Sequence, residues 1–170
     1  EVEDLKVYYY LANNTVKAVD GASLKISKGE ILGVVGESGS GKSTIGYSIL
    51  RLIKPPGKIV NGSIIINGRD VLSLSPNELR KFRWEEVAMV FQGAMNSFNP
   101  LRKIKKAFIE TLEEHGYYLT EQDPEFRERV YDRLQTVGLS PSVLDRYPHE
   151  LSGGMKQRAF IALALLTLSQ

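Results

Sequence analysis

The sequence predicts an α/β protein with an antiparallel β part at its front and helices in its second half. Residues 5–10 and 16–26 are rich in β-forming side chains and are separated by an Asn-Asn pair, which favours two antiparallel strands joined by a turn. Residues 31–35 are continuously apolar and lead into a glycine-rich loop, as expected for a strand buried on both faces of a parallel sheet. From Asn99 onward the chain is polar and its apolar residues follow a helical spacing.

The elements after the glycine-rich loop follow from periodicity and capping residues. A helix is predicted from Lys42, because apolar residues recur at i, i+4, i+7 and i+8 until Pro55. Residues 63–66 lie between two Asn-Gly turns and predict another strand, and residues 87–91 predict a second buried strand. Between them, Ser75 and Pro76 fit the cap and the first position of a helix.

Two further helices are predicted in the second half. One begins at Asp123-Pro124, has an apolar stripe of Val130, Leu134 and Val137, and has Gly138 as its C-cap. The other covers residues 156–168 and follows a Ser-Gly-Gly turn. With no internal repeat and no linker, these helices are expected to form a lobe on the same domain.

Composition restricts the class of protein only loosely. The 170 residues fit one domain, and a net charge of +2 gives no reason to expect nucleic acid as a partner. The absence of cysteine excludes a disulfide framework or a thiolate metal site within these residues. The longest apolar stretch, residues 159–166, is far shorter than the roughly 20 residues that span a bilayer, so any membrane role is expected to be peripheral.

The glycine-rich segment 36–43 matches the phosphate-binding pattern G-x-x-x-x-G-K-[ST] and lies between a predicted strand and a predicted helix, which is the context that the pattern requires. Its glycines allow backbone N-H groups to approach phosphates, and the N-terminus of the following helix favours anions. Lys42 is placed to reach the β- and γ-phosphates, and the Ser43 hydroxyl suits Mg²⁺. The sequence therefore predicts a P-loop NTPase core; the alternative is a glycine-rich turn that caps a helix, with Lys42 solvated.

A second motif, Leu-Ser-Gly-Gly-Met at residues 151–155, directly precedes the last predicted helix. Ser152 and the free N-H groups of that helix start predict a second anion site. A simple N-cap and turn is the alternative. Because the chain has two helix N-termini that suit phosphate, a nucleotide that contacts both motifs is favoured.

The two motifs, in this order and separation, resemble the nucleotide-binding domain of ABC transporters, whose signature is Leu-Ser-Gly-Gly-Gln; Met155 replaces that glutamine. The runs 18–21, 36–44, 91–100, 147–150 and 156–158 are similar to those of the oligopeptide and dipeptide uptake branch. Nickel importers and importers of other solutes have similar motifs. The resemblance covers essentially the whole chain.

The resemblance implies a set of site residues. Lys42 and Gln92 are expected to act in catalysis, with Ser43 and Gln92 at Mg²⁺. Gln92 would be the Q-loop glutamine, and a polar strand end is the alternative. The expected ATP-binding residues are Tyr9, Gly36, Glu37, Ser38, Gly39, Ser40, Gly41, Lys42, Ser43 and Thr44, and the residues expected to contact ATP bound to a partner subunit are Ser152, Gly153, Gly154 and Met155.

Two aromatic residues need separate interpretation. Tyr9 occupies the position at which the family places an adenine-stacking ring, but Tyr8 or Tyr10 would take that place after one step of register. A core or surface aromatic is the alternative reading of Tyr9. His149 precedes the signature, whereas the family's switch histidine follows it, so His149 is expected to be structural or solvated rather than catalytic.

The resemblance also implies a domain plan. Residues 1–30 and 58–72 would form the antiparallel β part, 31–57 and 87–92 the P-loop core, 93–154 the helical lobe with the signature, and 155–170 a helix returning to the core. The family's Mg²⁺-binding Asp, catalytic Glu and switch His are not found before Gln170. These 170 residues are therefore expected to bind ATP without efficient hydrolysis, and the full-length protein to be an ATPase.

The function implied is that of an ATP-hydrolysing subunit that energises uptake of di- or oligopeptides, working peripherally at the cytoplasmic face of the cell membrane. Its expected partners are a second ABC ATPase subunit, identical or related, transmembrane permease subunits and, indirectly, a solute-binding protein, with no nucleic acid. Alternatives are an importer of nickel or another small solute, a DNA-repair or chromosome-type ABC ATPase, and a regulatory module that binds ATP without hydrolysing it. The short separation of Gln92 and Ser152 disfavours the chromosome type, which inserts long coiled coils there.

Overall fold

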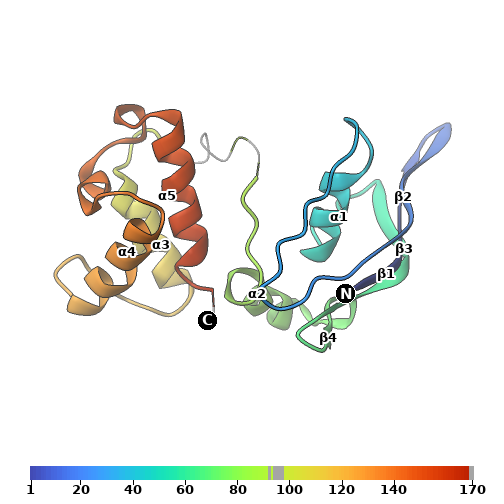
Figure 1. The fold of residues 1–170 in the computed structure, drawn as a ribbon, viewed down its shortest axis with the longest axis horizontal. Coiled ribbons are helices and arrows are strands. Elements are labelled where there is room, and N and C mark those ends of the chain that lie inside the picture. Colours follow the sequence, from blue (N-terminus) through green and yellow to red (C-terminus); the bar gives the residue numbers. More distant parts are fainter. Residues whose placement is uncertain (92, 94–97, 169–170) are drawn as a thin grey trace. The chain divides into compact units, whose positions relative to one another are not determined.

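The structure is a computed structural model that describes residues 1–91, 93 and 98–168. It divides into two compact units, Glu1–Arg80 and Lys81–Gln170, which are described separately (Figure 1). The elements of the first unit are β1 (Val2–Leu11), β2 (Asn14–Leu24), α1 (Lys42–Ile49), β3 (Gly57–Ile66), β4 (Arg69–Asp70) and the 3₁₀ helix η1 (Val71–Ser73). Helix α2 (Pro76–Glu85) spans the boundary.

The strands of the first unit form one antiparallel sheet in the order β2-β1-β3-β4. Tyr9 of β1 pairs with Val16 of β2 and with Gly57 of β3, so β1 is the strand that joins the other two. The predicted pair of antiparallel strands is confirmed, with a turn after Leu11. Apolar side chains from β1, β2, β3, the residue that follows α1 and the segment after β4 are buried: Val2, Leu5, Val7, Val19, Leu50, Ile64, Val71 and Leu74.

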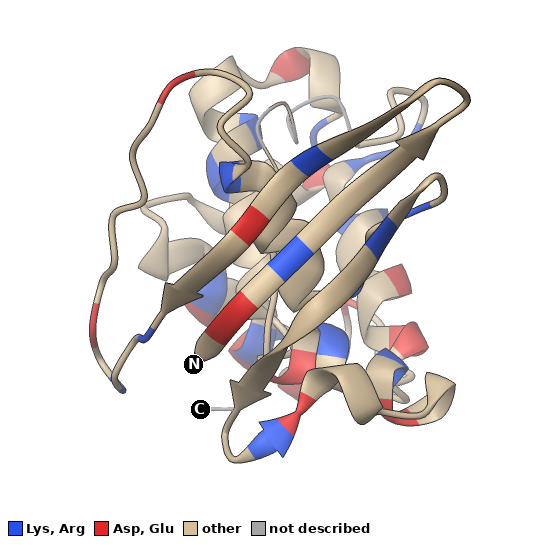
Figure 2. Cartoon of the chain, turned by 90° about the vertical axis from the view of Figure 1, so that its right-hand side faces the viewer, with Lys and Arg blue, Asp and Glu red and all other residues tan. Residues whose placement is uncertain are grey.

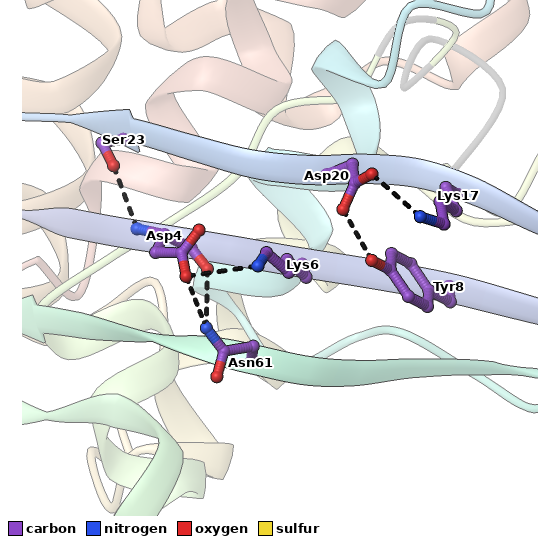
Figure 3. A network of polar contacts seen from close by, with 7 residues as sticks. All are labelled: Asp4, Lys6, Tyr8, Lys17, Asp20, Ser23 and Asn61. Carbon is purple, nitrogen blue, oxygen red and sulfur yellow. Dashed lines mark hydrogen bonds and ion pairs between the residues drawn. The ribbon is translucent and has the colours of Figure 1, made fainter.

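A β-bulge interrupts β1 at Asp4, where the register shifts against both neighbouring strands. Asp4 has a left-handed φ of 42°, and its backbone N-H donates to the Ser23 hydroxyl at 2.9 Å. Its carboxylate accepts a 2.7 Å hydrogen bond from the Asn61 amide and lies 3.4 Å from the Lys6 ammonium (Figure 3). Residues from three strands thus hold the bulge, on strands that carry charges of both signs (Figure 2).

The predicted buried strands over residues 31–35 and 87–91 are wrong in this structure. Ile31 and Val35 are 96% and 93% exposed, and neither segment is a strand; Val87 makes only an isolated bridge to Arg83. A strand in a parallel sheet is held by hydrogen bonds to its neighbours. Within the described residues no strand pairs alongside either run, so an apolar sequence alone does not produce a strand.

Helices and 3₁₀ turns make up the second unit: α3 (Ile104–Glu114), α4 (Pro124–Thr136), η3 (Pro141–Asp145), η4 (Pro148–Glu150) and α5 (Gly153–Leu165). They share one apolar core, whose fully buried members include Phe108, Leu112, Val130 and Leu134. The expected lobe of helices is therefore present. No helix in the described parts of the chain combines the length and the apolar character needed to cross a membrane.

The capping predictions are largely confirmed. Ser75 and Glu78 exchange hydrogen bonds at the start of α2, Asp123 is the N-cap of α4, and Gly138 follows that helix with a φ of 70°. Two boundaries differ from prediction. Helix α1 ends at Ile49, well before Pro55, and α5 begins at Gly153, three residues before the predicted start.

Candidate nucleotide-binding site

The glycine-rich loop leads directly into α1, and its conformation depends on glycine at two positions. Gly39 and Gly41 have φ values of 81° and 91°, a region that other residues rarely adopt. Gly41 precedes α1, and its carbonyl accepts the first helical bond, from Ile45 N-H at 3.0 Å. A Cβ on Gly41 would collide with the backbone carbonyl of Ala18 in β2. The sheet therefore sets the position of the loop through a close backbone contact.

Lys42, the first residue of α1, turns its ammonium group back over the loop. It donates hydrogen bonds to the carbonyl oxygen of Gly36 at 2.7 Å, to the carbonyl oxygen of Glu37 and to the Ser40 hydroxyl at 3.1 Å. Ser40 N-H also donates to the Glu37 carbonyl at 3.3 Å. The positive charge thus lies within the turn of the loop, beside the N-terminus of α1.

A pocket of about 150 Å³ opens at this place, lined by Ala18, Gly39, Ser40, Gly41, Lys42, Ser43 and Thr44. Three groups at this pocket suit a phosphate chain: the Lys42 ammonium, the N-terminus of α1 and the backbone of Gly39. The backbone of Gly39 is accessible, because an added Cβ there would meet nothing within 4 Å. Ser43 is exposed in the first turn of α1, where its hydroxyl is available as an oxygen ligand for Mg²⁺. The residues present therefore fit a magnesium nucleotide.

The three neighbouring tyrosines of β1 have different surroundings. The ring of Tyr9 lies against Gly57, since a Cβ on Gly57 would fall 2.6 Å from the ring. The Tyr8 hydroxyl donates to Asp20 at 2.6 Å (Figure 3), and Tyr10 is 47% exposed. Tyr9 thus packs on the sheet, and its stacking on adenine stays a prediction.

The signature motif forms the start of α5. Ser152 is the N-cap, and its hydroxyl accepts a 3.3 Å hydrogen bond from Met155 N-H while its carbonyl accepts one from Lys156 N-H at 3.0 Å. Ser152, Gly153 and Gly154 are exposed, and a Cβ on Gly154 would meet nothing within 4 Å. The predicted N-cap is confirmed, and the surface around it is open.

The structure brings together part of the predicted site. Gly36 to Thr44 form one loop and helix start in the first unit, whereas Ser152 to Met155 belong to the second unit. Gln92 lies outside the described residues. His149 is exposed and stacks on Tyr147, with ring centroids 5.5 Å apart.

Sequence reasoning missed the direct role of Ala18 in forming the pocket. This residue comes from β2, and its contact with Gly41 depends on the packing of that strand against the loop. In the sequence, residues 18–21 stand out only through their similarity to the same run in the family. A local pattern cannot show such a contact, because the two residues belong to different elements.

The family profile described as "ABC transporter" matches residues 19–170, most of the chain. The chain belongs to this family. It is 45% identical over 166 residues to the dipeptide transport ATP-binding protein DppD of Caldanaerobacter subterraneus, and 43% identical over 168 residues to the oligopeptide transport ATP-binding protein AppD of Bacillus subtilis. Each alignment covers 97% of this chain and 50% of the relative, so the chain spans about half the length of these relatives.

A solved structure confirms the fold class. The dimeric, post-hydrolysis ATP-binding cassette MJ0796, bound to ADP and Pi, superimposes with a TM-score of 0.79 at 28% identity. The match covers 98% of this chain and 68% of the other. The predicted α/β class, a P-loop NTPase core with an antiparallel β part and a helical lobe, is therefore correct, although the run at residues 31–35 is not a strand here.

Proposed function

We propose that this chain is the ATP-binding portion of an ABC-type ATPase that energises the uptake of di- or oligopeptides. The observation that carries the proposal is the position of Lys42, held over a glycine loop at the start of α1 and beside an open pocket. A phosphate chain in that pocket would receive backbone N-H donors, the positive end of α1 and the ammonium group together. Mg²⁺ would neutralise phosphate charge, with Ser43 and Gln92 as the proposed protein ligands.

The signature motif supports a role for a second ATPase subunit. Ser152, Gly153 and Gly154 are exposed at the N-terminus of α5, where free N-H groups suit an anion. We place ATP between Lys42 of one subunit and these residues of another, arranged head to tail. The solved relative is described as dimeric, which agrees with this arrangement. ATP can drive closure only by binding more tightly to the closed state than to the open state.

The peptide branch is supported by the names of the two relatives, which are dipeptide and oligopeptide transport proteins. On this proposal the subunit works at the cytoplasmic face of the membrane, on transmembrane permease subunits that receive peptide from a solute-binding protein. The two units described here would then be parts of one ATPase domain, with the β part and loop in one and the signature lobe in the other.

The proposal is tested with the full-length protein in its host. A strain that lacks the gene should lose uptake of labelled di- and tripeptides while keeping uptake of nickel, and the wild-type gene should restore peptide uptake. A Lys42→Ala gene should fail to restore it, although the variant protein accumulates normally. Loss of nickel uptake with normal peptide uptake would overturn the peptide assignment, and full restoration by Lys42→Ala would overturn the role of the loop.

A further inference from the structure

The short 3₁₀ turn η4 lies immediately before the signature motif. Two hydrogen bonds between Tyr147 and Glu150 close this turn. Tyr147 N-H donates to the Glu150 carboxylate at 2.6 Å, and Glu150 N-H donates back to the Tyr147 carbonyl at 3.0 Å. The first of these bonds is the half of a capping box in which the side chain at N3 reaches back to the N-cap N-H, and the second is the ordinary backbone bond of a 3₁₀ turn. Together they close the single turn Pro148–Glu150.

The turn is anchored in the lobe on both sides of Glu150. Pro148 is buried, and Leu151 is 5% exposed and belongs to the apolar core of the lobe. Leu151 N-H also donates to the Pro148 carbonyl at 3.2 Å. On the outer side, the rings of Tyr147 and His149 stack with an angle of 15° between their planes. The turn therefore has a defined conformation although its polar side faces solvent.

Ser152 itself has few direct restraints. It is exposed, and its hydroxyl makes one described contact, the 3.3 Å hydrogen bond from Met155 N-H. Leu151 is the only residue between Ser152 and Glu150. The direction in which the chain leaves η4 therefore sets where Ser152 and the first N-H groups of α5 lie.

We infer that Glu150 is a positioning residue for Ser152. Its carboxylate closes η4, and the closed turn holds the signature serine where it can meet nucleotide bound by another subunit. The inference rests on the proposed in-trans role of Ser152. What the turn requires is an oxygen that accepts the Tyr147 N-H bond, not a negative charge, so glutamine at position 150 preserves the function and alanine does not.

The test uses the full-length protein assembled with its natural subunits, in the wild-type form and as Glu150→Ala, Glu150→Gln and Ser152→Ala. Glu150→Ala should lower kcat for ATP hydrolysis by about fivefold or more, as expected for loss of one side-chain hydrogen bond that holds the turn. Nucleotide affinity of the isolated subunit should change by less than about twofold, since no contact in the P-loop is altered. Glu150→Gln should keep more than half of the wild-type kcat.

A double variant distinguishes positioning from general stability. If Glu150 acts through Ser152, adding Glu150→Ala to Ser152→Ala should lower kcat little further, because coupled residues are not additive. A fully additive loss would overturn the inference. Asp123→Ala is the matched control in the same lobe: it removes the N-H and hydroxyl hydrogen bonds of Thr120, at 2.6 and 2.8 Å, and should lower stability without lowering kcat.

The outcomes separate this inference from the proposed function. If Ser152→Ala hydrolyses ATP at the wild-type rate, the in-trans role fails and the inference fails with it. If Ser152→Ala is impaired while Glu150→Ala is normal, only the positioning role of Glu150 is overturned. If Glu150→Gln is as impaired as Glu150→Ala, the acceptor argument is wrong.

Discussion

The carbonyl oxygen of Ala18 lies too close to Gly41 for a Cβ to fit there, so a strand of the β part and the last glycine of the glycine-rich loop are in direct backbone contact. Because Gly41 also has a φ of 91°, this position has two independent reasons to be glycine. The contact couples the sheet to the start of α1. It accounts for the presence of Ala18 in a pocket otherwise made by the loop and α1.

Gly41→Ala should therefore weaken nucleotide binding by about tenfold or more, since the loop must move away from β2 to make room for the methyl group. Gly68→Ala is the matched control. Gly68 has a φ of 76°, but a Cβ there would meet nothing within 4 Å, and it lies outside the loop. Equilibrium binding of a fluorescent ATP analogue measures both. Equal affinity of Gly41→Ala and wild type would contradict the close contact.

The bulge in β1 should depend on Asp4. Asp4→Ala removes the hydrogen bond from Asn61 and the ion pair with Lys6, and leaves a left-handed φ that alanine disfavours. We expect a loss of about 1–2 kcal/mol in the free energy of unfolding. Urea denaturation measures it. Glu3→Ala, an exposed neighbour on the same strand, should change stability by less than about 0.5 kcal/mol.

The core of the helical lobe should be sensitive to truncation at Phe108, which is fully buried among Leu112, Val130 and Leu134. Phe108→Ala should cost about 3–5 kcal/mol, because the cavity adds to the lost burial of the ring. Tyr118→Ala is the control, since Tyr118 is 82% exposed. A thermal melt that is the same for Phe108→Ala and Tyr118→Ala would contradict the assigned core.

Acid should weaken the β part through Asp20. Hydrogen bonds from the Tyr8 hydroxyl and the Lys17 ammonium hold the pKa of Asp20 below its ordinary value. A carboxyl with a lowered folded-state pKa contributes stability above its unfolded pKa and loses it as the pH falls through the folded one. The loss should therefore lie below about pH 4.

Two variants test this pH dependence. Asp20→Asn should make the free energy of unfolding depend less on pH below about pH 4, where the wild-type carboxyl takes up its proton. Tyr8→Phe removes the shorter of the two hydrogen bonds, so the pKa of Asp20 should rise toward its ordinary value. An NMR titration of the Asp20 carboxyl measures the pKa directly. An unchanged pKa in Tyr8→Phe would contradict the role of that hydrogen bond.

Local signals in the sequence predicted the parts of the fold that depend on neighbouring residues. The β1–β2 hairpin, the Ser75–Glu78 cap, the start of α4 and the Ser152 cap are set by turn residues, hydrogen-bonding side chains and apolar spacing within a few positions. The glycine-rich loop could be predicted for the same reason, because its glycines and Lys42 all belong to one turn and to the helix start that follows it.

Features that depend on distant parts of the chain could not be predicted in this way. Residues 31–35 have the composition of a buried strand, yet strand formation needs a partner that their own sequence does not supply. The contact of Ala18 with Gly41 and the packing of Tyr9 on Gly57 likewise join residues of separate elements. The end of α1 could not be predicted from the local sequence either, because the helix ends at Ile49 and not near Pro55.

The most direct test of the account is a calorimetric titration of MgATP into the full-length subunit, in the wild-type form and as Lys42→Ala. We predict saturable binding by the wild type and an affinity lower by about tenfold or more in the variant, because on the proposed function the ammonium group would donate charge-assisted hydrogen bonds to phosphate oxygens. Lys58→Ala, which alters a lysine of β3 outside the loop, should bind as the wild type does. Equal affinity of Lys42→Ala and wild type would contradict the central claim that this loop holds the nucleotide.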